Sequence, residues 1–282
     1  MVLSIKEEKI LLGGEMNKKI GFIGAGNMGR AIAGGIIKAG IFDSKDILFS
    51  DINVENSDKM EQELKTKRMK NNIELVIDSD IIILAVKPYQ FEKIIGEIKE
   101  LVDEKKIIIS IAAGIKIEDI EKYFDREIKL VRVMPNTPAL VREGMTAIMP
   151  NRNILIDELE EVKRIFSSVG KIEIIEESLI DAVIAVSGSS PAYIFMLIEA
   201  MGDAAVLEGM DRKRAYFFAA QAVLGAAKMV LETGEHPGKL KDMVCSPGGT
   251  TIEAVVKLEE KGFRSSIMEA MRVCANKSKN LV

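Results

Sequence analysis

Short, uninterrupted runs of Ile, Val and Leu recur along residues 19–134, and they constrain the fold more than any other feature of the chain. The runs Ile81–Val86 and Lys106–Ile111 show the pattern best. Continuous branched-aliphatic runs are typical of parallel strands that are buried on both faces. The amphipathic stretches between them predict helices that cover the sheet. The sequence therefore predicts an α/β fold with a doubly wound, mostly parallel sheet.

The predicted elements follow from this alternation. The strands are Lys19–Gly24, Asp46–Ser50, Ile81–Val86, Lys106–Ile111, Lys129–Met134, Met145–Met149 and Lys171–Ile175. The clearest helices between them are Met28–Ala39, Asn56–Lys67 and Asp157–Ser168.

After Glu176 the strand signals stop and helical patterns take over. The predicted helices are Pro191–Glu208, Arg212–Glu232, Thr251–Glu260 and Phe263–Asn280. Ser190 is expected to cap the first of them and Gly209 to end it. Several are apolar nearly all round, so every side must be buried. Because a segment of about 100 residues cannot bury them alone, we expect a homodimer or a higher oligomer of dimers.

The domain organisation follows: residues 17–176 form the α/β domain and residues 177–282 an all-α domain. Residues 1–16 read as an N-terminal extension. Gly13-Gly14-Glu15 can be encoded by a purine-rich ribosome-binding site directly before Met16. We therefore expect translation to begin at Met16 and residues 1–15 to be disordered or absent.

Composition excludes several classes of function. The formal net charge is −4 and there is no basic tract, so nucleic acid is not an expected partner. Two cysteines and no export signal indicate a reducing cytoplasm. The uncharged segment Ala182–Ile198 is interrupted by Ser187–Pro191, which predicts a buried helix rather than a membrane span.

The segment Gly24–Gly29 (GAGNMG) matches G-x-G-x-x-G immediately after a strand and at the start of a helix. In that context Gly24 permits the tight turn, Gly26 lets the backbone approach a pyrophosphate, and Gly29 lets helix and strand pack closely. A purely structural glycine turn is the alternative. The motif predicts a Rossmann dinucleotide site whose loop residues are Gly24, Ala25, Gly26, Asn27, Met28 and Gly29.

Asp51 lies about 20 residues beyond Gly29, where an acid hydrogen-bonds a ribose 2′-hydroxyl. No Arg stands beside it to meet a 2′-phosphate, which favours NADH over NADPH. Alternatively, Asp51 only caps the following loop.

Further segments end the predicted strands or interrupt the helices. They are Ala85-Val86-Lys87-Pro88, Ser110–Gly114, Met134–Pro138, His236-Pro237-Gly238 and Cys245–Thr251. In this order, from Lys18 to about Lys279, they resemble the pyrroline-5-carboxylate reductase family. The most specific part is SPGG-x-T after HPG-x-L.

The resemblance implies a Rossmann domain followed by a helical dimerisation domain, and NAD(P)H reduction of 1-pyrroline-5-carboxylate to proline. It implies that the nicotinamide end is lined by Ala85, Val86, Lys87, Pro88, Ala112, Ala113 and Gly114. It implies that the substrate is held by Ser246, Gly248, Gly249, Thr250 and Thr251, from the partner subunit. Many relatives carry Asn-Arg or Ser after the second strand and accept NADPH, so Asp51 leaves the choice between NADPH and NADH open.

The Cys245–Thr251 segment suits a cyclic imine carboxylate. Gly248 and Gly249 let bare backbone approach a ligand, and Thr250-x-x-Glu253 reads as a capping box that opens a helix. The N–H groups at a helix N-terminus bind a carboxylate. Thr251 is then free to hydrogen-bond the imine nitrogen, as the catalytic residue; the alternative is an ordinary helix start with two capping threonines.

Histidine and cysteine, the usual residues for acid–base catalysis and metal binding, are scarce in this chain. His236, the sole histidine, lies in a turn, and an imine reduction needs no strong acid–base side chain because the protein mainly positions nicotinamide and imine. Cys245 is expected to serve packing. No metal site is expected, because two Cys and one His have no ligand spacing.

Three rival functions remain. A hydroxy-acid dehydrogenase of the 6-phosphogluconate type uses a lysine on the helix after the interdomain segment, but Pro191–Glu208 contains none. A non-catalytic dinucleotide-sensing dimer needs no Ser246–Thr251 loop. A methyltransferase would bind S-adenosylmethionine through the glycine loop, and ligand-dependent thermal stability separates it.

Overall fold

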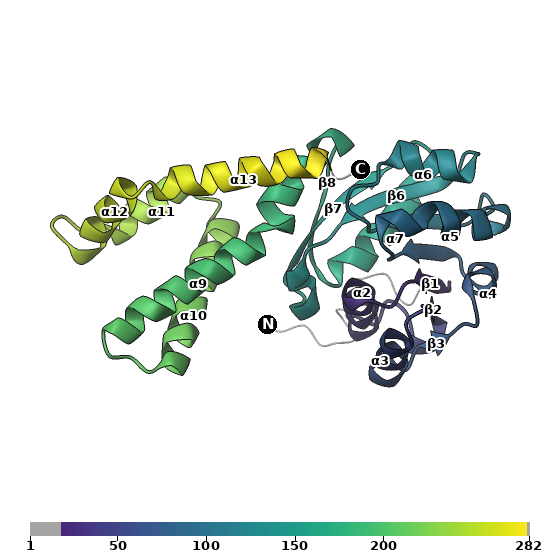
Figure 1. Cartoon of the computed structure of the whole chain (residues 1–282), viewed down its shortest axis with the longest axis horizontal. Coiled ribbons are helices and arrows are strands. Elements are labelled where there is room, and N and C mark those ends of the chain that lie inside the picture. Colours follow the sequence, from purple (N-terminus) through teal and green to yellow (C-terminus); the bar gives the residue numbers. More distant parts are fainter. Residues whose placement is uncertain (1–17, 281–282) are drawn as a thin grey trace. The chain divides into compact units, whose positions relative to one another are not determined.

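In the computed structural model, residues 18–280 are described; the predicted extension over residues 1–16 lies outside them. They contain an eight-stranded sheet in the order β3-β2-β1-β4-β5-β6-β7-β8 (Figure 1). The strands are β1 Ile20–Ile23, β2 Ile47–Ser50, β3 Lys67–Arg68, β4 Ile81–Leu84, β5 Ile107–Ser110, β6 Lys129–Met134, β7 Gly144–Pro150 and β8 Gly170–Ile174. Neighbouring strands pair in parallel except β6 and β7, which confirms the doubly wound, mostly parallel sheet.

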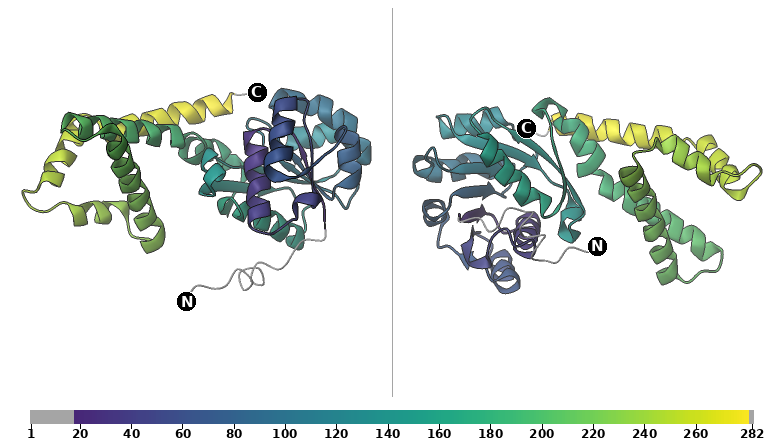
Figure 2. Two further views of the ribbon diagram at one scale, coloured as in Figure 1. Left: turned by 90° about the horizontal axis from the view of Figure 1, so that it is seen from below. Right: turned by 180° about the vertical axis from the view of Figure 1, so that it is seen from behind.

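Helices cover both faces of the sheet (Figures 1 and 2). One face packs against α2 Asn27–Lys38, α3 Val54–Leu64 and α7 Ile156–Ser167. The other packs against α4 Asn72–Asp78, α5 Phe91–Ile98 and α6 Ile117–Phe124. Alternate strand residues point to opposite faces, so Ile107 and Ile109 lie in the first core and Ile108 in the second. Both cores are closed, which explains why these strands carry no polar alternation.

Two elements of the sheet region were not predicted. Strand β3 has only two residues, both charged and exposed, so it carries no hydrophobic pattern. Helix α4 has seven residues and is capped by Asn71, whose side chain accepts from the Glu74 N–H. The predicted helix Asn56–Lys67 begins earlier, at Val54, and ends earlier, at Leu64, because Lys65 adopts a left-handed conformation with φ 55° and ends α3.

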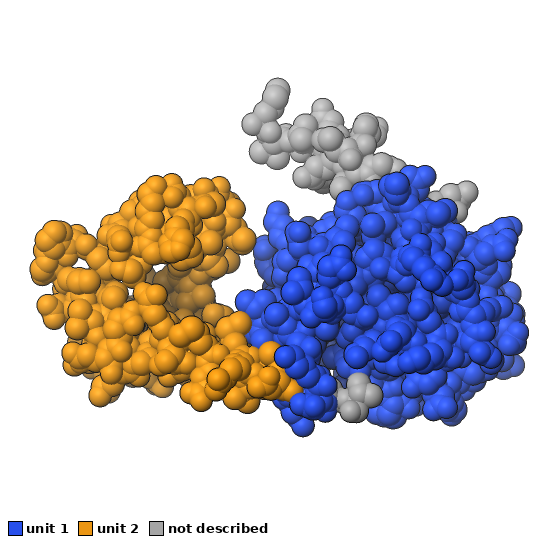
Figure 3. Space-filling view, turned by 90° about the horizontal axis from the view of Figure 1, so that it is seen from above, with its two compact units in different colours: residues 1–188, 277–282 blue, residues 189–276 orange. Residues whose placement is uncertain are grey.

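The described residues divide into two compact units, residues 18–188 with 277–280 and residues 189–276 (Figure 3). The helical elements after β8 are α8 Ile180–Val183, a π-helical turn Ile184–Gly188, α9 Ser190–Leu207, α10 Arg212–Thr233, α11 Pro237–Val244, α12 Thr250–Glu260 and α13 Phe263–Lys279. Helix α11 was not predicted, because His236-Pro237-Gly238 reads as a turn.

The predicted interruption within Ser187–Pro191 is confirmed but short. The π-helical turn ends at Gly188, Ser189 forms a bend, and α9 begins at Ser190, because a first-turn proline such as Pro191 is compatible with a helix. Ser190 is already the first residue of α9, and Ser189 precedes it at the cap position, where its hydroxyl accepts from the Cys274 thiol at 3.2 Å instead of capping the helix. Gly209, with φ +92°, does follow the end of the helix as predicted.

Helices α9 and α10 expose many large apolar side chains. Phe195 and Met196 on α9 are 64% and 68% exposed, and Phe217 and Phe218 on α10 are 71% and 61% exposed. Within a single chain Gly202 is the one buried residue of α9, so the predicted burial of this helix needs a second copy of the chain. By length and hydropathy alone, the stretches Glu177–Leu207 and Arg212–Thr233 would pass as membrane spans. Apolar surface of this extent marks an interaction face.

Candidate active site

The carboxyl edge of the sheet brings the predicted cofactor segments together. Strands β1 and β4 are neighbours, and the chain leaves them toward opposite sides of the sheet, which is a topological switch point. The glycine loop follows β1, Asp51 follows β2, Ala85–Pro88 follows β4 and Ala112–Gly114 lies after β5. Open α/β sheets bind their ligands at this position.

Two of the three motif glycines are constrained by neighbouring backbone, and the third is not. Gly24 has φ +102°, and a Cβ added there would lie 2.5 Å from the Ala85 carbonyl oxygen. A Cβ on Gly29 would lie 2.8 Å from the Gly24 carbonyl oxygen. A Cβ on Gly26 would meet nothing within 4 Å, so this position faces open space. Gly24 and Gly29 are therefore needed by the fold itself, whereas Gly26 leaves room for a ligand.

Helix α2 begins with its amide groups uncapped. Gly26 occupies the N-cap position, which has no side-chain hydrogen bond, and the first turn carries no acidic residue. An α-helix leaves its first N–H groups unpaired and places a partial positive charge there. This end of α2 is consequently suited to a pyrophosphate.

Asp51 is held by its own chain. Its carboxylate accepts hydrogen bonds from the backbone N–H of Ala25 at 2.6 Å and of Asn53 at 2.7 Å. The bond to Asn53 is the loop-capping role that sequence reasoning kept as an alternative. The bond to Ala25 adds a second role, because it links the end of β2 to the glycine loop.

Arg30 is the cation on the first turns of α2, and it faces other protein groups. Its guanidinium lies 3.5 Å from Glu63 and donates to the Asn27 side-chain oxygen at 2.9 Å. The hydrogen bond and the charge of Lys59 lower the pKa of Glu55, and the charge of Arg30 lowers it further. Glu63 is thus paired with Arg30 and Glu55 with Lys59, whereas the Asp51 carboxylate is bonded to backbone amides.

The segments after β4 and β5 lie next to each other. The Ile111 N–H donates to the Leu84 carbonyl at 3.3 Å, and the Ala112 N–H donates to the Ser110 hydroxyl at 3.4 Å. Gly114 has φ +84° and turns the chain toward α6. Lys87 and Pro88 are exposed.

The Ser246–Thr251 loop differs from its prediction in one respect. Helix α12 begins at Thr250, with Gly249 as N-cap and no side-chain cap, so the predicted capping box with Glu253 does not form. Thr250 is already helical and its side chain is thus beyond the cap position. Gly248, with φ +67°, makes the turn in which the Gly249 N–H donates to the Ser246 carbonyl at 3.0 Å.

This correction makes the start of α12 more open than predicted. The N–H groups of its first turn have no side-chain cap. The hydroxyl groups of Thr250 and Thr251 have no hydrogen-bond partner in residues 18–280. Such a helix start offers both amide donors and a free hydroxyl to a ligand.

His236 and Cys245 take structural places. His236 is the N-cap of α11, and its Nδ1 accepts from the Gly238 N–H at 3.0 Å. Cys245 is a free, partly buried cysteine. Within residues 18–280, no cluster of three or more His, Cys, Asp or Glu side chains is placed to hold a metal ion.

Sequence reasoning missed two buried polar features beside the site. Arg132 on β6 is 3% exposed and pairs with Glu177 at 2.7 Å. Asn136, also buried, donates to the Ser187 carbonyl at 2.9 Å and accepts from the Met145 N–H at 2.9 Å. The available signal was a lone Arg within the apolar strand KLVRVM.

Two protein families match separate parts of this chain. Residues 177–281 match the family described as pyrroline-5-carboxylate reductase dimerisation, and residues 19–114 match NADP oxidoreductase coenzyme F420-dependent. A pyrroline-5-carboxylate reductase of Escherichia coli (strain K12) is 50% identical over 266 residues, covering 94% of this chain and 99% of that protein.

Solved structures of two such reductases have the same fold as this chain. A pyrroline-5-carboxylate reductase of Coxiella burnetii superposes with a TM-score of 0.88 at 35% identity, covering 94% of this chain and 99% of that one. A pyrroline carboxylate reductase of Plasmodium falciparum, solved with NADP bound, gives 0.86 at 34% identity, with coverage of 95% and 99%. Together with the sheet, the glycine loop and the helical unit, these likenesses show that this chain belongs to the pyrroline-5-carboxylate reductase family.

Proposed function

We propose that this protein reduces the C=N bond of 1-pyrroline-5-carboxylate to L-proline, the last step of proline biosynthesis, by hydride transfer from NADH or NADPH. The observation that carries this proposal is the 50% identity to a pyrroline-5-carboxylate reductase over 94% of the chain. The carboxyl edge of the sheet supports it independently, because it presents a dinucleotide loop at the switch point of the strand order.

The cofactor residues proposed are the glycine loop Gly24–Gly29, Asp51, Ala85–Pro88 and Ala112–Gly114. The loop and the uncapped start of α2 would hold the pyrophosphate, and the segments after β4 and β5 would hold the nicotinamide. Asp51 would meet the ribose 2′-hydroxyl. Because Asp51 repels a 2′-phosphate, and Arg30 is already engaged with Glu63 and Asn27, we propose that NADH is preferred over NADPH.

The substrate residues proposed are Ser246 and Gly248–Thr251. The amide groups at the start of α12 would bind the carboxylate, and the Thr251 hydroxyl would hydrogen-bond the ring nitrogen. The hydride adds to the imine carbon while the nitrogen takes a proton, so the product is a secondary amine. Positioning and exclusion of water are then the main demands on the protein.

Two features disfavour the rival dehydrogenase and sensor functions. Helix α9 contains no lysine, which a hydroxy-acid dehydrogenase of the 6-phosphogluconate type would use. A non-catalytic sensor has no use for the open start of α12 with its free threonine hydroxyl groups.

The proposal includes the setting of the enzyme. The exposed apolar faces of α9 and α10 fit a second copy of this chain, as a homodimer or an oligomer of dimers. We propose a cytoplasmic location without membrane or nucleic-acid partners. We also propose a domain boundary between residues 176 and 177, where the dimerisation-family match begins, whereas the two compact units divide after Gly188.

A labelled cofactor tests the reaction. Reduced nicotinamide dinucleotide carrying deuterium in the transferred position is mixed with the purified protein and 1-pyrroline-5-carboxylate. Mass spectrometry is expected to find proline one mass unit heavier. Absence of labelled proline, from a folded protein that binds the dinucleotide, would overturn the proposal.

A further inference from the structure

Arg132 and Glu177 form an ion pair near the end of β5, in which the Arg132 side chain is 3% exposed and the Glu177 side chain 29% exposed. Arg132 lies opposite Ser110, the last residue of β5, and both lie near the carboxyl edge. Val131 and Val133 point into one core and Leu130 into the other, so the alternation of side chains sends Arg132 to the face covered by α6.

One oxygen of Glu177 contacts two elements. Glu177 Oε1 accepts from Arg132 Nη1 at 2.7 Å and from the Ile117 N–H at 2.8 Å. Ile117 is the first residue of α6, and Glu177 begins the turn that follows β8. The carboxylate therefore joins β6, the start of α6 and the segment that leads into the helical region.

These bonds fix the far end of the Ala112–Gly114 segment. Its near end is held by β5, where the Ile111 N–H donates to the Leu84 carbonyl. Its far end is the start of α6, whose Ile117 N–H is held by Glu177. Gly114, with φ +84°, lies between the two and gives the segment freedom to move when one end is released.

Arg132 is too buried to touch a ligand itself, because its side chain is 3% exposed. Its charge acts on Glu177, and the charge-assisted bond from the buried guanidinium holds that carboxylate in one place. We infer that Arg132 and Glu177 are positioning residues, which set the Ala112–Gly114 segment against the nicotinamide of the cofactor. This inference rests on the proposed function, because it takes that segment to line the nicotinamide.

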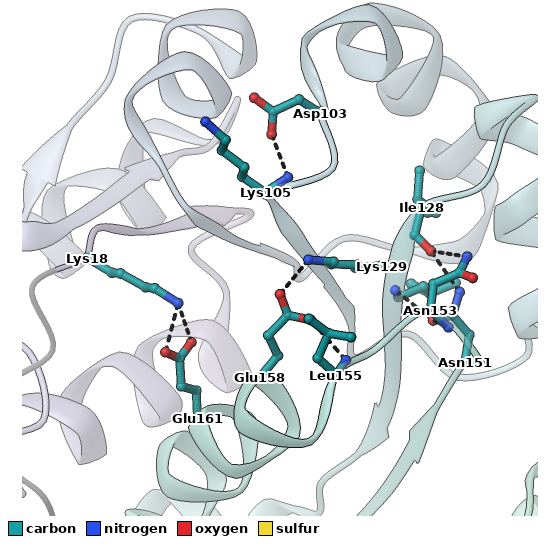
Figure 4. Close-up of polar contacts among 11 residues, drawn as sticks. Lys18, Asp103, Lys105, Ile128, Lys129, Asn151, Asn153, Leu155, Glu158 and Glu161 are labelled. Carbon is teal, nitrogen blue, oxygen red and sulfur yellow. Dashed lines mark hydrogen bonds and ion pairs between the residues drawn. The ribbon is translucent and has the colours of Figure 1, made fainter.

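The same strand offers a matched control. Lys129, the first residue of β6, pairs with Glu158 of α7 at 2.5 Å, and their side chains are 19% and 15% exposed (Figure 4). This pair is also largely buried and joins β6 to a helix. It lies at the amino end of β6, away from the carboxyl edge, so its loss affects stability without moving the cofactor segment.

The experiment compares Glu177→Ala, Glu177→Gln and Glu158→Ala with the wild type by NADH titration and steady-state kinetics. The fluorescence of bound NADH reports the surroundings of the nicotinamide. We expect Glu177→Ala to bind NADH with a Kd within about threefold of wild type, to lose most of the emission change of bound NADH, and to lose about tenfold in kcat. Glu177→Gln keeps an oxygen acceptor for both donors and is expected to stay near wild type.

The control variant distinguishes a loss of stability from a loss of positioning. Glu158→Ala is expected to lower the Tm while leaving emission and kcat unchanged. If Glu177→Ala matches Glu158→Ala in emission and kcat, the pair is merely structural and the inference is wrong. If Glu177→Ala does not fold, Arg132→Lys, which keeps the charge but not the reach, is judged by the same readouts. Wild-type protein that binds no NADH would instead overturn the proposed function.

Discussion

The Asp51 carboxylate accepts a hydrogen bond of 2.6 Å from the backbone N–H of Ala25 in the glycine loop. A bond between an ionised acceptor and an amide is among the stronger hydrogen bonds in proteins. It fixes the carboxylate at the end of β2, at the position where a Rossmann fold meets the adenosine ribose. One residue thus shapes the loop and sets the charge that a 2′-phosphate would encounter.

Asp51→Ser tests that charge. Serine removes the charge that repels a 2′-phosphate, so the ratio of kcat/KM for NADPH to that for NADH should rise about tenfold, or about 1.4 kcal/mol. Asp46→Ser, which precedes the other end of β2, is the control and should leave the ratio alone. An unchanged ratio in Asp51→Ser would mean that Asp51 does not face the ribose.

The Gly26→Ala substitution tests whether a ligand occupies the space beside Gly26, because it should change dinucleotide affinity without changing stability. No atom lies within 4 Å of an added Cβ at Gly26, so the Tm should stay near wild type while dinucleotide affinity falls about tenfold. Gly24→Ala, by contrast, places a Cβ 2.5 Å from the Ala85 carbonyl in a left-handed conformation and should lower stability by about 1–3 kcal/mol. Thermal unfolding and NADH titration measure both effects.

Gly96→Ala is the control for that pair, because an added Cβ there also meets nothing within 4 Å. It lies on α5 and should leave dinucleotide affinity unchanged. Equal affinity in Gly26→Ala and Gly96→Ala would show that the pyrophosphate does not approach Gly26.

Thr251→Ala should lower turnover by about ten- to a thousandfold with the fold intact, because one polar contact to the reacting group is lost. Thr251→Ser keeps the hydroxyl and should retain most of the activity. Thr233→Ala, near the end of α10, removes an exposed hydroxyl elsewhere and serves as control. Wild-type turnover in a folded Thr251→Ala variant would exclude Thr251 from the mechanism.

Phe217→Asp should convert the oligomer to a smaller species and lower its Tm. Phe217 is 71% exposed and packs edge-to-face on Phe218, with ring centroids 6.3 Å apart. A charge in an apolar interface must be desolvated without a partner. Val141→Asp, at an equally exposed site of 71% in the sheet-containing unit, should not change the mass in sedimentation. The same mass for both variants would place the interface elsewhere.

The sheet was predictable because buried parallel strands consist mostly of consecutive aliphatic residues, as in Ile107–Ser110. The glycine loop was predictable because its spacing carries a backbone constraint that the structure confirms at Gly24 and Gly29. Strand β3 was not, because the pair Lys67–Arg68 has no hydrophobic period.

The site was less predictable than the fold. The capping box at Thr250 failed because one residue of register decides whether a threonine caps a helix or joins it. Ala25 and Asp51 are distant in sequence, and so are Glu177 and its two partners. A local sequence pattern does not predict hydrogen bonds between such residues.

The most direct measurement of the central claim mixes the purified protein with racemic 1-pyrroline-5-carboxylate and follows the absorbance of NADH and NADPH in parallel. The account predicts oxidation of the cofactor matched mole for mole by proline, with a higher kcat/KM for NADH. A folded protein that binds dinucleotide but oxidises neither cofactor would contradict it.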